Sequence, residues 1–127
     1  MSVATKLLLL GLAGGLGSLA RYGTGVLVER HATGIFPWPT FVVNMAGCLL
    51  FGAFYAFAEQ RAGWSGDVRV IVLTGFMGAY TTYSTFAFQS TELLMERHIA
   101  LALANIVGQS VLGVIFILLG LELGKLI

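Results

Sequence analysis

Charged residues are scarce in this chain, and the scarcity decides its class. Only 10% of the 127 residues are charged, against about 25% in an average soluble protein, whereas 57% are hydrophobic and the mean hydropathy is +0.90. Such a composition excludes an ordinary soluble domain and indicates an integral membrane protein. The net charge of +1 likewise gives no reason to expect nucleic-acid binding.

Cysteine is almost absent, and so are the residue clusters that enzymes use. The single cysteine, Cys48, lies inside an apolar stretch, so neither a disulfide nor a cysteine metal site is expected. We find no phosphate-binding loop, no cluster of metal-ligating side chains and no nucleophile paired with a base. We therefore expect a protein that is not an enzyme.

The sequence consists mainly of long apolar runs. Three runs carry no charged residue, and a fourth is interrupted only by Arg21. Because about 20 apolar residues cross a bilayer as a helix, we predict an all-α integral membrane protein whose residues 1–127 form a single membrane domain. Its four transmembrane helices are expected over about 3–29, 38–60, 68–95 and 99–125.

The third helix is unusual because small and hydroxyl-bearing residues crowd its middle. Gly75 and Gly78 precede four hydroxyl side chains inside the uncharged run 70–91. Glycine frees the backbone and hydroxyls can bond to carbonyls released from a helix, so we predict that this helix is broken at mid-membrane, over 78–80. Unwound backbone at that depth is where transport proteins hold ions, so the segment indicates movement of a small ion. The four hydroxyl side chains are Thr81, Thr82, Ser84 and Thr85.

A bundle of four short helices is too thin to enclose a pore, so we expect an oligomer. Its orientation in the membrane is weakly specified, because the cationic residues of the two sides differ in number by only two. Ordinary insertion with the N-terminus in the cytoplasm and insertion both ways with antiparallel pairing both fit this distribution. The cations are Lys6, Arg61, Arg69 and Lys125 on one side and Arg30 and Arg97 on the other.

Polar side chains inside the predicted helices each admit two interpretations. Arg21 either snorkels or pairs with a carbonyl, or it lines an aqueous vestibule that concentrates anions. Asn44, on one helix face with Thr40, either bonds a neighbouring helix or turns its N–H donors toward a pore, where a dehydrating anion needs them. Asn105 and Gln109, four residues apart, either join two helices or form a polar track beside the pore.

Glycine is abundant, and the first helix holds several glycines at a packing spacing. Gly11 and Gly15 lie four residues apart, as do Gly14 and Ser18, which is the spacing that lets membrane helices approach closely. We interpret this motif as a packing surface in preference to a ligand contact.

Three motifs in the first three helices together identify a family. The longest, in the third helix, is specific, whereas the glycine motif of the first would be weak alone. In order they are Gly14-Gly15-x-Gly17-Ser18-x-x-Arg21-Tyr22, Thr40-x-x-x-Asn44-x-x-Gly47 and Gly75-x-x-Gly78-x-x-Thr81-Thr82-Tyr83-Ser84-Thr85-Phe86. With these motifs the chain resembles, over essentially its full length, the bacterial fluoride-specific ion channels of the Fluc or CrcB type.

The resemblance implies an antiparallel, dual-topology homodimer in the cell inner membrane, with two fluoride pores. The broken third helices of the two subunits would cross at its centre. There the backbone carbonyls of Gly78 and Thr81 from both subunits would hold a structural sodium ion. Coordination by oxygen alone suits such a hard cation.

The resemblance also implies a set of pore residues. Tyr83 and Phe86 fall where family members place two aromatic rings whose edges, the positive part of the ring quadrupole, face fluoride. Asn44 falls on the family's pore asparagine, and Ser110 continues its polar track in the fourth helix. Beyond the resemblance, we add Thr40 and Arg21 to the expected fluoride pore, with Arg21 as the residue that draws anions in.

Three positions depart from the family pattern. Tyr83 replaces the commoner phenylalanine, and its hydroxyl donor either supplements or displaces the edge contact. Gln89 stands where many members carry glutamate, which removes a titratable carboxylate. Pro39 occupies a position that is often glycine, a change expected to affect only the start of a helix.

We therefore expect a passive fluoride-selective channel that exports fluoride from the cytoplasm and lowers its toxicity. One alternative is a small proton-coupled multidrug exporter, which needs a carboxylate inside the first helix, where this chain has only Glu29 at the end. Another is a non-transporting scaffold subunit whose hydroxyls pack against a partner. Fluoride efflux without a proton gradient would separate the three.

Overall fold

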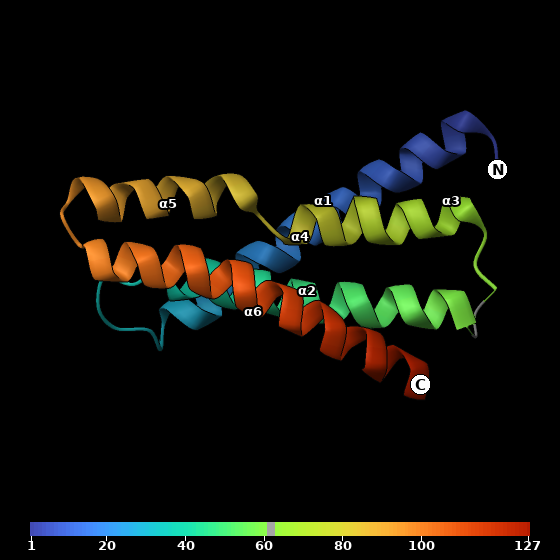
Figure 1. Cartoon of the computed structure of the whole chain (residues 1–127). Helices are drawn as coiled ribbons and strands as arrows, with labels where there is room; N and C mark the ends of the chain where they lie inside the picture. Colours follow the sequence, from blue (N-terminus) through green and yellow to red (C-terminus); the bar gives the residue numbers. More distant parts are fainter. Residues whose placement is uncertain (61–62) are drawn as a thin grey trace.

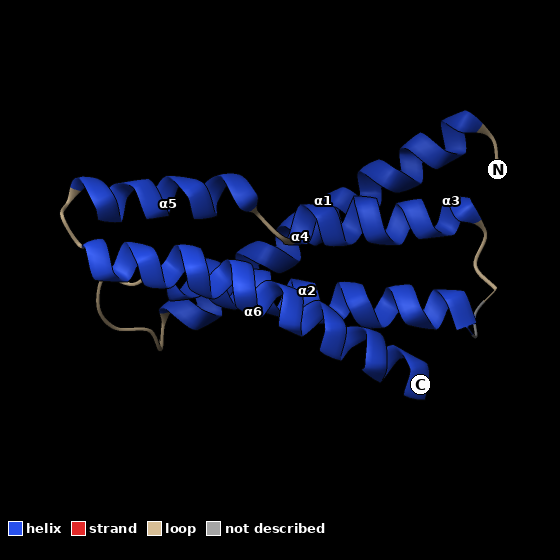
Figure 2. Cartoon of the chain, in the orientation of Figure 1, coloured by secondary structure: helices blue, strands red, loops and turns tan. Residues whose placement is uncertain are grey.

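The fold was obtained as a computed structural model that describes residues 1–60 and 63–127. Every regular element among these residues is helical (Figure 2). In the described part of the chain, three helices are long and apolar enough to cross a membrane: α1 (Val3–Glu29), α2 (Trp38–Gln60) and α6 (Ile99–Leu126). The chain is thus an all-helical, multi-pass membrane protein, as its composition predicts. Arg61, one of the flanking cations, lies outside the described residues.

The segment between α2 and α6 is built from four short pieces (Figure 1). α3 (Gly66–Arg69) leads into a π-helix, η1 (Val70–Met77), and then into a last turn, α4 (Gly78–Tyr80). After a short extended connection, α5 (Tyr83–Met95) completes the segment. Figure 1 shows α5 as a separate rod, offset from the stretch that runs from α3 to α4.

The break in this segment lies later than predicted. Residues 78–80, the predicted break, are helical, and the interruption is at Thr81 and Thr82, whose backbone is extended (φ −82°, ψ 163° and φ −148°, ψ 117°). The prediction relied on glycine, but Gly78 has an ordinary helical conformation. The hydroxyl of Thr82 accepts a hydrogen bond from Thr85 N–H at 3.3 Å and so caps the new helix. The capping threonine, not the glycine, marks the break.

α2 and α6 pack closely because glycine replaces side chains along their contact. A Cβ atom added at Gly52 would overlap the carbonyl of Ile117, and one added at Gly120 would overlap the carbonyl of Leu49. Lipid provides no hydrophobic drive between helices, so this close backbone approach supplies the packing. The two helices form the frame against which the broken segment lies.

α1 packs on η1 through part of its glycine motif. Gly17 is buried, and a Cβ atom there would overlap the carbonyl of Phe76. Gly11 and Gly15, by contrast, have open space around them. Gly17 was not part of the predicted packing surface. Of that surface, Gly14 lies beside η1, with its Cβ position 3.8 Å from the Gly75 carbonyl oxygen, so the surface is used within the chain only in part.

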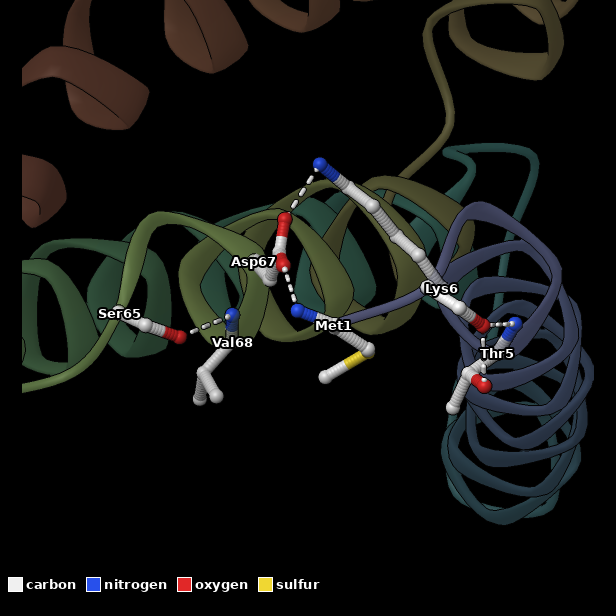
Figure 3. Close-up of polar contacts among 7 residues, drawn as sticks. Met1, Thr5, Lys6, Ser65, Asp67 and Val68 are labelled. Carbon is white, nitrogen blue, oxygen red and sulfur yellow. Dashed lines mark hydrogen bonds and ion pairs between the residues drawn. The ribbon is translucent and has the colours of Figure 1, made fainter.

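The start of α1 is tied to α3 by a small ion-pair cluster (Figure 3). The carboxylate of Asp67 pairs with the Lys6 ammonium at 2.7 Å and with the Met1 amino group at 3.4 Å. The hydrogen bond from Lys6 is the main cause that lowers the pKa of Asp67. Beside it, Ser65 Oγ accepts from Val68 N–H at 3.4 Å and caps α3. The cluster joins α1 to the first half of the broken segment.

Candidate functional site

The break is held by Asn44 of α2. Asn44 Oδ1 accepts the Thr82 N–H at 2.9 Å, and Asn44 Nδ2 donates back to the Thr82 carbonyl at 3.0 Å. This reciprocal pair satisfies the backbone groups that an interrupted helix leaves open, which membrane depth requires. Asn44 Nδ2 also donates to Gln109 Oε1 on α6 at 2.7 Å. Both amide donors of Asn44 are therefore engaged within the chain.

Arg21 of α1 reaches the other extended residue of the break. Its Nη1 donates to the Thr81 carbonyl at 3.4 Å. Thr81 in turn bonds back to the helix that it ends, because its N–H and its hydroxyl both donate to the Met77 carbonyl, at 3.1 and 3.2 Å. Of the interpretations offered for Arg21, pairing with a carbonyl is the one that the geometry shows.

Four of the predicted pore residues gather around one cavity beside the break. Asn44, Tyr83, Phe86 and Ser110 line a cavity of about 280 Å³ between α2, α5 and α6. Its wall combines amide and hydroxyl groups with apolar and aromatic surface, which suits a small ion that must exchange water for protein donors. The other lining residues are Met45, Cys48, Thr81, Thr82 and Gln109.

The other two predicted pore residues line a second cavity. Arg21 and Thr40 border a space of about 370 Å³ between α1, α2 and the break. Thr82 lines this second cavity as well as the first. The predicted set is therefore divided between two cavities that share the break as part of their wall.

The two aromatic residues that follow the break lie next to each other. The ring centroids of Tyr83 and Phe86 are 5.7 Å apart, and the ring planes are tilted by 56°. Tyr83 is 80% exposed, whereas Phe86 is half-buried. A single chain therefore leaves the ring of Tyr83 uncovered.

The predicted cation ligands lie at the end of the first half-helix. In an unbroken helix the Thr82 N–H would donate to the Gly78 carbonyl, but here it donates to Asn44. The Gly78 carbonyl thus loses its usual helical donor, and Gly78 is exposed. A carbonyl oxygen that has lost its helical donor suits a hard cation. The Thr81 carbonyl oxygen, by contrast, already accepts a hydrogen bond from Arg21.

A chain of hydrogen bonds that the sequence did not reveal lies next to the first cavity. Gln109 Nε2 donates to Asn105 Oδ1 at 2.8 Å, and Asn105 Nδ2 donates to Ser90 Oγ at 2.9 Å. Ser90 Oγ donates to the Phe86 carbonyl at 2.8 Å. The sequence left two interpretations open for Asn105 and Gln109, a bond between helices or a polar track beside the pore; both residues bond to other helices, and Gln109 also lines the cavity. Ser90 gave no signal, because a serine inside a helix commonly bonds its own backbone.

Gln89 lies apart from both cavities. It lines a separate space of about 450 Å³, together with Glu29, Glu92 and Glu96. Its Oε1 is buried and has no hydrogen-bond partner in the described part of the chain. The departure from the family pattern at this position therefore falls outside the predicted pore lining.

A comparison with protein-family models gives one match over most of the chain. The family is described as CrcB-like protein, Camphor Resistance (CrcB), and its model matches residues 8–121. The matched region contains α2, the broken segment and both cavities. The similarity therefore extends across the whole candidate site.

Curated proteins match at nearly full length. A protein named fluoride-specific ion channel FluC from Nitratidesulfovibrio vulgaris (strain DSM 19637 / Miyazaki F) is 53% identical over 123 residues, which cover 96% of this chain and 98% of that protein. The protein of the same name from Nitrosococcus oceani is 45% identical over 122 residues, with 96% and 98% coverage. That from Phocaeicola vulgatus is 39% identical over 120 residues, with 94% and 98% coverage.

Proposed function

This chain belongs to the CrcB-like family, and from that membership we infer that it is a fluoride-specific ion channel of the cell inner membrane. It exports fluoride from the cytoplasm and so lowers fluoride toxicity. It is an ion channel rather than an enzyme. The structural observation that carries the inference is the cavity lined by Asn44, Tyr83, Phe86 and Ser110 beside an interrupted membrane helix.

A passive path is sufficient for this export. Neutral HF enters a cell from acidic surroundings and dissociates in the cytoplasm, where the fluoride ion is trapped. An inside-negative membrane potential favours exit of the anion by about 2.3 kcal/mol per 100 mV, roughly a fifty-fold bias. Neither a fuel nor a coupled ion is needed.

We propose that the residues around the break have separate roles in fluoride permeation. Arg21 and Thr40 border the cavity in which positive charge attracts the anion, and Asn44 supplies an N–H donor in place of water. The hydroxyl of Ser110 now donates to the Ile106 carbonyl at 2.7 Å and reaches an ion by rotation about one bond. This assignment is supported by the positions of these side chains around the two cavities.

The aromatic pair would select for the smallest halide. Tyr83 and Phe86 both line the first cavity, and their ring edges carry the positive part of the quadrupole. The hydroxyl of Tyr83 adds a donor that a phenylalanine would lack. A larger anion would gain less from ring edges held so close together.

We further propose that two copies pair as an antiparallel, dual-topology homodimer with two pores. The support is what one chain leaves uncovered: Tyr83 is 80% exposed, Gly78 is exposed, and the glycine face around Gly11 and Gly15 has open space. A second copy would cover polar residues that lipid cannot satisfy. It would also complete the wall of each pore.

Sodium fits this dimer as a structural ion held by the Gly78 and Thr81 carbonyls of both copies. The Gly78 carbonyl is released from the helix, and the Thr81 oxygen has a second lone pair beyond the one that faces Arg21. When bound, the ion would neutralise carbonyl dipoles that meet where the two breaks cross. The residues of this chain would supply only backbone oxygen, which suits a hard cation.

Purified protein in liposomes tests the function directly. Vesicles are loaded with potassium fluoride or potassium chloride, valinomycin removes the limiting potential, and electrodes record efflux with no proton gradient. A channel releases fluoride quickly and retains chloride. Release of nothing would favour a scaffold subunit, and release only with a proton gradient would favour a coupled exporter; either result would overturn the inference.

A further inference from the structure

Five residues from three elements form one directed chain of hydrogen bonds. Asn44 donates to Gln109 at 2.7 Å, and Gln109 donates to Asn105 at 2.8 Å. Asn105 donates to Ser90 at 2.9 Å, and Ser90 donates to the Phe86 carbonyl at 2.8 Å. The final acceptor is a backbone carbonyl, which cannot become a donor. Each side-chain amide in this series of hydrogen bonds therefore has only one orientation in which all of these bonds form.

This orientation presents Gln109 Oε1, and not its NH₂ group, to Asn44. Reversal of the Gln109 amide would set one NH₂ group against another and would leave Asn105 Oδ1 without its donor. Such a loss is costly because Asn105 is fully buried and Gln109 is only 7% exposed. Gln109 nevertheless lines the same cavity as Asn44. An acceptor oxygen thus lies 2.7 Å from the nitrogen proposed to meet the ion.

The bond to Gln109 is the one that Asn44 can exchange most readily. The contact with Thr82 consists of two bonds, at 2.9 and 3.0 Å, and its loss would leave two backbone groups of the break unpaired. The contact with Gln109 is a single bond at the cavity wall. An anion that replaces Gln109 Oε1 as the acceptor would leave the break intact.

We propose that Gln109 is a positioning residue that competes with fluoride for one N–H of Asn44. As the ion arrives, this N–H turns from Gln109 Oε1 to fluoride, and it returns as the ion leaves. Asn105 and Ser90 keep the Gln109 oxygen in place. The competition weakens the hold on the ion, which favours conduction because a permeating ion must be released as well as bound. The proposal rests on the proposed function.

Two substitutions at one position isolate the competing oxygen. Gln109→Met and Gln109→Glu both remove the donor to Asn105, but only Gln109→Glu keeps an acceptor facing Asn44. Initial fluoride efflux from liposomes, measured over a series of internal fluoride concentrations, gives the maximal rate and the half-saturating concentration. We expect Gln109→Met to lower the half-saturating concentration roughly two- to tenfold, the range of one net hydrogen bond, and to lower the maximal rate. Gln109→Glu should raise the half-saturating concentration.

Tyr80→Phe is the matched control. It removes a hydrogen bond from Tyr80 to Thr24 Oγ1 (3.2 Å) beside the same break, outside the chain of amides. Its half-saturating concentration should equal that of the wild type. If Gln109→Met leaves this concentration unchanged or raises it, Gln109 has only a structural role and the inference fails while the channel function stands. A wild type that passes no fluoride would instead overturn the proposed function.

A second measurement needs no variant. Asn44 and Asn105 are the only asparagines and Gln109 is one of three glutamines in the sequence, so the few side-chain amide signals of ¹⁵N-labelled protein can be assigned by NMR. Sodium fluoride, titrated against sodium chloride, should shift the Asn44 and Gln109 amide signals together and the Asn105 signal less. A conducting wild type whose Gln109 signal ignores fluoride would overturn the inference.

Discussion

At the scale of single residues, Asn44 joins three parts of the molecule. Its amide bonds both backbone groups of Thr82 and the side chain of Gln109, so α2, the break and α6 meet at one side chain. From the sequence, its amide was expected either to bond a neighbouring helix or to turn its donors toward a pore. The structure shows the first, and the cavity position leaves room for the second as an exchange of partners.

Replacing Asn44 tests both its hydrogen bonding at the break and its proposed role as a donor to the permeating ion. In Asn44→Asp the carboxylate cannot donate to Thr82 or Gln109, and each partner left unpaired costs about 1–3 kcal/mol. A negative charge also repels the permeating anion. We expect fluoride efflux from liposomes to fall at least about thirtyfold, the factor that corresponds to two losses of about 1 kcal/mol each. Gln60→Glu, which adds the same charge at the exposed end of α2, should conduct normally; full efflux in Asn44→Asp would remove Asn44 from the pore.

Asp67 gives a prediction for stability against pH. Pairing with Lys6 lowers the pKa of Asp67 in the folded state below its value of about 3.9 in the unfolded chain. The stabilisation by this carboxylate is therefore complete above pH about 4 and is lost as pH falls through the lower folded pKa. Thermal unfolding in detergent between pH 6 and pH 2.5, both approximate limits, should show a steeper acid loss in the wild type than in Asp67→Asn.

The control for Asp67 is another acid with a nearby lysine. Glu122 pairs with Lys125, and both residues belong to the exposed end of α6. Glu122→Gln should keep the acid dependence of the wild type. Equal acid dependence in the wild type and Asp67→Asn would show that the cluster in Figure 3 does not hold α1 to α3.

At the scale of elements, α2 and α6 depend on glycine for their contact. A Cβ atom at Gly120 would overlap the Leu49 carbonyl, which belongs to rigid helical backbone. We expect Gly120→Ala to lower the free energy of unfolding by about 1–3 kcal/mol, the usual cost of overpacking. Thermal unfolding in detergent measures the change, with Gly23→Ala in α1 as the control because nothing lies within 4 Å of its Cβ. Equal stability of the two variants would contradict the packing argument.

The broken segment shows how far element-level prediction reaches. The crowding of glycine and hydroxyl residues predicted a break, but placed it at 78–80, whereas the extended residues are Thr81 and Thr82. Glycine can adopt the helical conformation as well as the irregular ones, and Gly78 is helical in the turn that packs against α1. The break falls where Asn44 of α2 can accept the Thr82 N–H, and a residue 38 positions away leaves no local trace in the pattern.

At the scale of the whole molecule, the dimer proposal predicts that the two breaks meet. In a Cys48→Ala background, which removes the only native thiol, Gly78→Cys should form a disulfide between copies, because crossing segments bring the two positions within about 7 Å. Gly34→Cys, in the loop after α1, is the control and should remain reduced. Non-reducing gels of membranes measure both; absence of the Gly78→Cys dimer would contradict the crossing.

The sequence predicted some residues of the candidate site and missed others. The motifs that contain Asn44, Tyr83 and Phe86 predicted three residues that the fold brings to one cavity. Arg21 and Thr40 line a different cavity, and Ser90 was missed. Which motifs face each other depends on how helices cross, and helical spacing contains no information on crossing.

Composition and apolar run length alone determined that the chain is helical and spans the membrane, because in lipid only a helix or a closed barrel satisfies the backbone. The glycine and hydroxyl residues in the middle of the third segment predicted that it is not a plain span. Only the tertiary structure decided where that segment breaks and which way the buried amides point. Those outcomes depend on hydrogen bonds between α2, α5 and α6, whose partners are distant in the sequence and become neighbours only after the helices have packed.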